Sequence, residues 1–145
     1  MLRMNKLADY GTVAMVFLAQ NGAGLVSARD IATHTHLGLP TVSKVLKRLL
    51  AAGLLVSVRG KAGGYALKHN ASDIAVTDIL YALDASRGLT ACSSEPAACA
   101  LHQVCKVKNN WRLISQTIEA ALESVSLEAL ATPVIPLKTL NQMKN

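Results

Sequence analysis

The sequence predicts a mainly α-helical fold that carries one β-hairpin. Three short amphipathic helices precede a stretch in which the apolar period changes from 3.6 residues to two, and a long amphipathic helix follows near the C-terminus. With 145 residues, 51% of them hydrophobic, the chain can form one packed domain with a helical appendage. Its apolar runs are shorter than the roughly 18 residues of a membrane helix, so we expect no membrane span.

The first two helices are predicted from apolar periodicity and end signals. Apolar residues recur at three- and four-residue steps over residues 5–20, and a glycine-containing run at 21–24 ends that helix. Ser27 is expected to cap a second helix over residues 28–35, in which Asp30 lies in the first turn, where a negative charge suits the helix dipole.

A third helix and a hairpin complete the N-terminal unit. The helix is expected from Thr41 to about Ala52, because Pro40 in the preceding turn disfavours helix for the residue before it. Residues 54–59 and 65–68 are predicted strands, joined by a glycine-rich turn. Helix, helix, turn, helix and hairpin in this order describe a winged helix-turn-helix, which we expect to occupy residues 1–84.

The C-terminal part is predicted to hold two more helices. A short one covers residues 76–83, with Thr77 able to cap it, and a long one covers residues 108–126. The long helix carries an apolar seam at helical spacing, formed by Trp111, Ile114, Ile118, Ala121 and Val125. Such a stripe needs a covering surface, so residues 108–131 are a predicted dimerisation segment and residues 132–145 a flexible tail.

The charge distribution indicates a nucleic-acid partner. Residues 1–69 carry nine Lys or Arg against two acids, a net charge of +7, whereas residues 70–145 carry a net charge of −1. A solvated basic face would have the same composition. The residues expected to contact double-stranded DNA lie at the start of the third helix and on the hairpin; they are Thr41, Ser43, Lys44, Lys47, Arg59 and Lys61.

All three cysteines fall within one fourteen-residue window, inside a cysteine-rich segment at residues 85–107. An odd number of thiols argues against a disulfide framework, whereas Cys92, Cys99 and Cys105 together suit a soft metal or an iron–sulfur cluster that lacks one ligand. His102 would complete a tetrahedral zinc site, although the tight Cys-x-x-Cys pair usual in zinc sites is missing. A thiol switch, with Lys106 near a cysteine, is a third alternative.

Several stretches resemble one known family in their order along the chain. They are residues 49–65 (LLAAGLLVSVRGKAGGY), 6–11 (KLADYG), 79–84 (ILYALD), the three-cysteine segment and the Trp111 helix. Together they resemble the IscR/NsrR (Rrf2) family of winged-helix iron–sulfur regulators, over residues 1 to about 130. Residues 9–13 and 110–114 most resemble the regulators of the SUF iron–sulfur assembly system.

The resemblance implies specific roles. Cys92, Cys99 and Cys105 would bind a cluster, [2Fe–2S] in preference to [4Fe–4S], and Arg59 would enter a minor groove. The position of the family's histidine ligand, three residues after the last cysteine, holds Lys108, which is not a credible cluster ligand.

The fourth cluster ligand must therefore come from another position, or be solvent or a small thiol. Asp9 matches the acidic residue that reaches the cluster from the partner subunit in the family's nitric-oxide sensor, and it is preferred here to His102. The other histidines, His34 and His36, flank a turn and are expected to lie near phosphates or to have no role.

The predicted function is that of a cytoplasmic, homodimeric DNA-binding repressor that controls iron–sulfur assembly genes through its cluster. A zinc- or thiol-based repressor of the same fold, responsive to redox state or nitric oxide, is the closest alternative. A small iron–sulfur redox protein is a rival from another class. The sequence lacks paired carboxylates, a Ser/His/Asp arrangement and a phosphate-binding glycine loop, so we expect no enzymatic activity.

Overall fold

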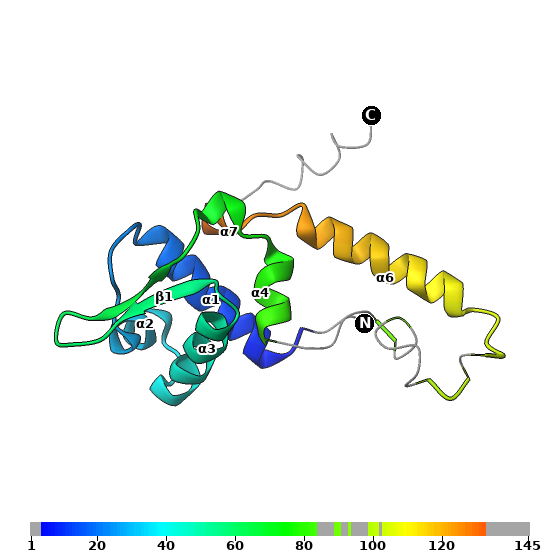
Figure 1. Cartoon of the computed structure of the whole chain (residues 1–145), viewed down its shortest axis with the longest axis horizontal. Coiled ribbons are helices and arrows are strands. Elements are labelled where there is room, and N and C mark those ends of the chain that lie inside the picture. Colours follow the sequence, from blue (N-terminus) through cyan, green and yellow to red (C-terminus); the bar gives the residue numbers. More distant parts are fainter. Residues whose placement is uncertain (1–3, 84–88, 91–92, 94–98, 102, 133–145) are drawn as a thin grey trace.

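The computed structural model describes residues 4–83, 89–90, 93, 99–101 and 103–132 (Figure 1). A compact unit holds most of these residues, and one long helix projects from it. In chain order the elements are α1 (Lys6–Gln20), α2 (Ala28–Thr35), α3 (Leu39–Ala51), β1 (Leu55–Val58), β2 (Gly64–Leu67), the 3₁₀ turn η1 (Ala71–Asp73), α4 (Val76–Leu83), α6 (Lys108–Glu123) and α7 (Leu127–Ala131).

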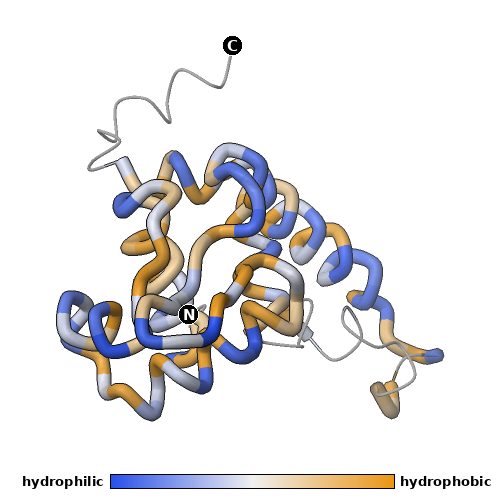
Figure 2. Tube along the Cα trace, turned by 60° about the vertical axis from the view of Figure 1, so that its left-hand side comes forward, coloured by the Kyte–Doolittle hydropathy of each residue, from blue (hydrophilic) through white to orange (hydrophobic). Residues whose placement is uncertain are grey.

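The core of the compact unit is built around α1. Helices α2, α3, α4 and α7 all contact α1, and their apolar faces enclose a single buried cluster. Figure 2 shows hydrophobic and hydrophilic residues alternating along the helices, as the 3.6-residue periodicity predicts. The fully buried side chains are Met15, Leu18, Ile31, Val42, Val45, Leu46, Leu49, Ile74, Ile79, Leu83 and Leu127.

Strands β1 and β2 form an antiparallel hairpin whose register runs from Leu55 opposite Leu67 to Val58 opposite Gly64. The end of the hairpin next to the turn is held by a third segment, because Val26 exchanges both backbone hydrogen bonds with Tyr65, at 3.0 and 2.8 Å. The helices and this hairpin form the predicted winged helix-turn-helix.

The start of one helix and the cap of another differ from the sequence prediction. Helix α3 begins at Leu39, two residues early, because Pro40 occupies the first turn, where its missing N–H costs nothing. In α4 the predicted cap Thr77 is buried within the helix, and the Asp78 carboxylate instead accepts a hydrogen bond from the Ala75 N–H at 2.9 Å. Short polar side chains next to each other can compete for the capping role, and the sequence does not decide between them.

The long C-terminal helix is shorter than predicted. Helix α6 ends at Glu123, and the chain then returns to the compact unit, where the Val125 carbonyl accepts from Val76 N–H and Leu127 N–H donates to Ile74. Helix α7 follows and buries Leu127 completely against the core. Val125 therefore lies outside the helix, and its predicted place in the α6 seam was wrong. Among the described residues no helix has the length and apolar character needed to cross a membrane.

Candidate nucleic-acid interface and cysteine-rich segment

Helix α3 presents two lysines to solvent. Lys44 and Lys47 are exposed, whereas Thr41 and Ser43, which were also predicted to contact DNA, are half-buried. The opposite face of α3 carries Val42, Val45, Leu46 and Leu49, all fully buried. Burial of this face fixes the rotation of the helix and so determines which side chains point outward.

The hairpin places two more cations in solvent. Arg59 directly follows β1, Lys61 lies in the turn, and both are exposed. Gly60 has φ of +121°, a conformation that side-chain-bearing residues rarely adopt, and the Gly63 N–H donates to its carbonyl at 3.0 Å. Strand β1 also packs against α3, so the base of the hairpin lies next to that helix.

The electrostatic character of this region is uniformly positive. Between Asp30 and Asp73 the chain contains six Lys or Arg residues and no acidic residue. That stretch includes the whole of α3 and the wing, which are the two elements that enter grooves in winged-helix proteins. A phosphate backbone is the polyanion that such a surface would attract.

Arg48 has a role that the sequence did not reveal. Its side chain is exposed like those of Lys44 and Lys47, but its guanidinium also donates a hydrogen bond to the Leu83 carbonyl at 2.6 Å. Leu83 is the last residue of α4, so this contact joins α3 to the end of α4. Periodicity places Arg48 on a face of its own helix, and it cannot identify a partner 35 residues away.

The cysteine-rich segment is described in part. Cys99 and Cys105 are half-buried free thiols, whereas Cys92 and His102 lie outside the described residues. The Cys105 N–H donates to Leu101 at 2.9 Å, which forms a helical turn just before α6. No group of three potential metal ligands is formed by the residues that the structure describes. The two described thiols suit an iron–sulfur cluster or zinc by their donor chemistry.

The predicted fourth ligand, Asp9, lies in the first turn of α1 and is exposed. This position leaves its carboxylate accessible to a second molecule. Two residues later, Gly11 is buried against Leu83, at the contact between α1 and α4.

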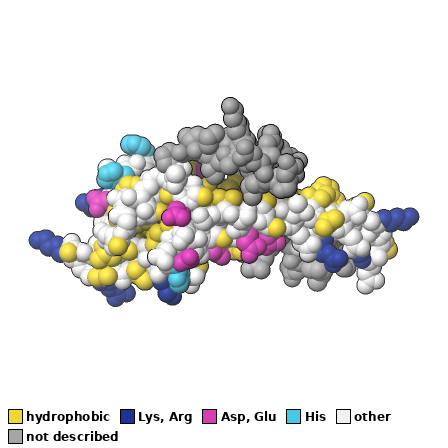
Figure 3. All heavy atoms as spheres, turned by 90° about the horizontal axis from the view of Figure 1, so that it is seen from above, with side chains coloured by type: hydrophobic (Ala, Val, Ile, Leu, Met, Phe, Trp, Pro, Cys, Tyr) yellow, Lys and Arg dark blue, Asp and Glu magenta, His cyan; other side chains and the backbone are white. Residues whose placement is uncertain are grey.

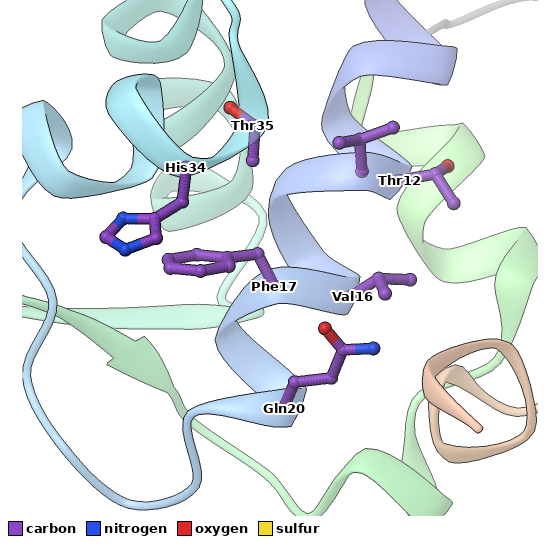
Figure 4. A pocket seen from close by; sticks show the side chains of 7 residues that line it. Thr12, Val16, Phe17, Gln20, His34 and Thr35 are labelled. Carbon is purple, nitrogen blue, oxygen red and sulfur yellow. The ribbon is translucent and has the colours of Figure 1, made fainter. Parts of the chain in front are cut away.

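The His34 side chain makes contacts within the fold. Its ring stacks on Phe17 with centroids 5.1 Å apart, and Nδ1 lies 2.8 Å from the Asp30 carbonyl. Figure 4 shows this pair beside an open, largely apolar cavity of about 370 Å³ between α1 and α2. His36 has a left-handed backbone conformation and ends α2.

Helix α6 projects with much of its apolar surface uncovered. Trp111, Leu113 and Ile114 are 41%, 65% and 43% exposed, and Ile118 is half-buried. Yellow, hydrophobic surface remains along this projecting arm in Figure 3. Three apolar residues before it, Leu101, Val104 and Val107, are also exposed. So much apolar surface on one arm is typical of a protein–protein contact.

One side of α6 is nevertheless fixed to the compact unit. Helix α6 contacts α4, and the buried Ser115 hydroxyl accepts a hydrogen bond from the Leu89 N–H at 3.1 Å. This bond holds the chain three residues before Cys92.

Comparison with known proteins gives consistent matches. Residues 4–133 match the Rrf2 family model, described as an iron-dependent transcriptional regulator. The transcriptional regulator IscR of Photorhabdus laumondii is 33% identical over 130 residues, covering 89% of this chain and 79% of IscR.

Two solved structures match over nearly the whole chain. CymR, the global cysteine regulator of B. subtilis, has a TM-score of 0.76 and 28% identity, with coverage of 93% of this chain and 100% of CymR. IscR of T. potens has a TM-score of 0.70 and 30% identity, with coverage of 99% of this chain and 92% of IscR.

Proposed function

The chain belongs to the Rrf2 family of transcriptional regulators, and on that premise we propose that it is a homodimeric DNA-binding repressor controlled by an iron–sulfur cluster. The observation that carries the proposal is the position of the cysteines. They lie between α4, which packs on the recognition helix, and α6, which carries the uncovered apolar surface. A sensor placed there can affect both DNA binding and dimer geometry.

DNA binding would use α3 and the wing. Lys44 and Lys47 would contact the major groove and its phosphates, with the shorter side chains of Thr41 and Ser43 beside them. Arg59 would enter an adjacent minor groove and Lys61 would contact the backbone. We expect a palindromic operator, because a two-fold symmetric dimer presents two such surfaces.

Dimerisation would cover the exposed face of α6. Trp111 and Ile114 are separated by one helical turn and both are exposed, as expected for residues that a second copy buries. The exposed residues before the helix would extend the contact toward the cysteines. The two symmetric sensor segments would then lie near the interface.

The cysteines would hold the cluster. Cys92, Cys99 and Cys105 would supply three thiolates, and Asp9 of the second subunit would supply the fourth ligand, with [2Fe–2S] preferred to [4Fe–4S]. When bound, an iron–sulfur cluster supplies a redox-active centre. The protein's contribution is to change the relative position of its DNA-binding units when the thiolates are occupied. Genes for iron–sulfur assembly are the proposed targets, and the cytoplasm the proposed location.

The first test is anaerobic purification. We expect a coloured protein that contains iron and sulfide, and we expect Cys92→Ala, Cys99→Ala and Cys105→Ala each to abolish the colour. Asp9→Ala should retain a cluster with an altered spectrum or stability, because three thiolates remain, whereas His102→Ala should have little effect. Stoichiometric zinc without iron would contradict the proposed cluster and show that the cysteines form a zinc site.

The second test is DNA affinity with and without the cluster. A duplex selected from a randomised library by the anaerobic protein serves as the probe. Allosteric control predicts that the affinity changes by about 5–150-fold between the two forms. Equal affinities would overturn control by the cluster and leave DNA binding in place.

A thiol-based regulator of the same fold is the second candidate. The free thiols of Cys99 and Cys105 favour it. In that case colourless, metal-free protein would change its DNA affinity on oxidation, and a reductant would reverse the change.

A further inference from the structure

We infer that Arg48 transmits the state of the cysteine-rich segment to the recognition helix, through its hydrogen bond to Leu83. This inference rests on the proposed function, because it requires that the sensor changes DNA affinity. It assigns the coupling to a particular contact and makes Arg48 a positioning residue rather than a DNA contact.

The contact joins α3, which carries the exposed lysines, to the end of α4, from which the chain continues to the cysteines. Arg48 lies on α3 one turn after Lys44, so any movement of its backbone moves the exposed lysines as well. Its guanidinium donates to the Leu83 carbonyl at 2.6 Å. Carbonyls in the last turn of a helix have no partner within the helix, and a charged donor makes a strong, directional bond to such a group. Arg48 therefore fixes the end of α4 against α3.

Leu83 is also fixed through its side chain. The side chain is buried against α1 at Gly11, where a Cβ atom would lie only 1.9 Å from Leu83 Cδ1. One residue thus joins α1, α3 and α4. On α1 the same contact lies two residues from Asp9, the proposed cluster ligand.

The chain after Leu83 leads directly to the cysteines. Cys92 lies nine residues after Leu83, and the chain is held again at Leu89 by the bond to Ser115 on α6. A change in the cysteine-rich segment can therefore act on the end of α4 from two sides, along the chain and through α6. If this displacement breaks the Arg48–Leu83 bond, α3 loses its attachment to the end of α4 and can shift with its lysines.

The alternative roles of Arg48 predict different measurements. If it contacts phosphate, its loss weakens DNA binding equally in the cluster-bound and cluster-free forms. If it only stabilises the fold, its loss lowers the melting temperature without changing the affinity ratio. Only the coupling role lowers the ratio between the two affinities.

The experiment compares Arg48→Met with Lys44→Met in the full-length protein. Methionine retains an unbranched apolar stem and removes the donors, and Lys44 is a cation one turn away on the same helix. The affinity of each protein for the selected duplex is measured by fluorescence anisotropy, anaerobically with the cluster and again after its removal. Melting temperatures and iron content are measured in parallel.

We expect Lys44→Met to weaken both forms by the same factor and so to leave the ratio unchanged. Arg48→Met should retain its iron and lower the ratio by at least about threefold, out of a coupling that is typically about 5–150-fold. Arg48→Lys, which keeps one charged donor, should restore part of the ratio. If Arg48→Met does not fold, Arg48→Ala replaces it, because alanine also removes the donors and favours helix; Lys44→Ala is then the matched control and should leave the ratio unchanged.

An unchanged ratio in a folded Arg48→Met, or in its replacement Arg48→Ala, overturns the inference whatever the loss in absolute affinity. A wild-type protein with equal affinities in the two forms would instead overturn the proposed function. The two failures are thus distinguishable in one set of titrations.

Discussion

Replacing Gly11 with alanine would place a methyl group in space that the Leu83 side chain occupies. The new Cβ would lie 1.9 Å from Leu83 Cδ1, whereas carbon atoms in contact are normally about 3.5–4.0 Å apart. Leu83 is fully buried, so it cannot move into solvent. Overpacking of this kind costs about 1–3 kcal/mol, and alanine recovers about 0.5–1 kcal/mol through its better helix propensity. We therefore expect a net loss of about 1–2 kcal/mol.

A double-mutant cycle tests the origin of that loss. Leu83→Ala alone should cost about 2–5 kcal/mol, because it leaves a cavity in the core. In Gly11→Ala with Leu83→Ala the clash disappears, so the combined loss should be smaller than the sum of the single losses by the clash energy, about 1–3 kcal/mol.

Urea denaturation followed by far-ultraviolet circular dichroism measures each free energy of unfolding at one fixed protein concentration. Losses that add to within about 0.5 kcal/mol would show that the two residues do not interact, and would refute the assigned contact between α1 and α4. An increase in the free energy of unfolding for Gly11→Ala alone would likewise refute this contact.

The remaining predictions concern DNA binding and dimerisation. Arg59→Ala should cost about 1–3 kcal/mol of binding free energy at the selected duplex and relax the sequence preference there. Lys47→Ala should weaken binding to all duplexes similarly and reduce the slope of log affinity against log salt concentration by about one unit. Equal, sequence-independent losses from both variants would make Arg59 a phosphate contact. Ile114→Glu combined with Ile118→Glu should give a monomer with weak DNA binding, as measured by sedimentation, and a variant that stays dimeric would exclude this face of α6.

The winged helix could be predicted from sequence because its signals are local. The periodicity of residues 5–20, the Ser27 cap and the change to a period of two after Gly53 each determine the structure of a short segment. The observed bounds of α2 are those predicted, and the β-hairpin is displaced by only one residue at its ends.

The errors arise where a distant partner decides the structure. Helix α7 is only five residues long and is stabilised by burial of Leu127 against the core and by backbone bonds near η1. Its local start signal is the Ser126 side chain, which accepts a hydrogen bond from the Ala129 N–H at 3.2 Å, but one serine does not by itself separate α7 from a continuation of α6. Val125 was assigned to the seam for that reason.

The candidate site could be predicted only in part. Its cations are identified by type and position, and Lys44, Lys47, Arg59 and Lys61 are exposed as a DNA-binding role requires. The side chains that connect the elements could not be identified, because Arg48 looks like one more surface cation until the tertiary structure brings it to Leu83.

The attachment of the wing to Val26 has a consequence for the entropy of DNA binding. An isolated two-stranded hairpin is marginally stable, and each residue that becomes ordered on binding costs about 1–2 kcal/mol of conformational entropy. The two hydrogen bonds between Val26 and Tyr65 order the strands up to the end next to the turn before DNA arrives. Only the exposed tip, residues 59–62, would then lose freedom in the complex. The wing is thus preorganised, and more of the contact energy of Arg59 is available as affinity.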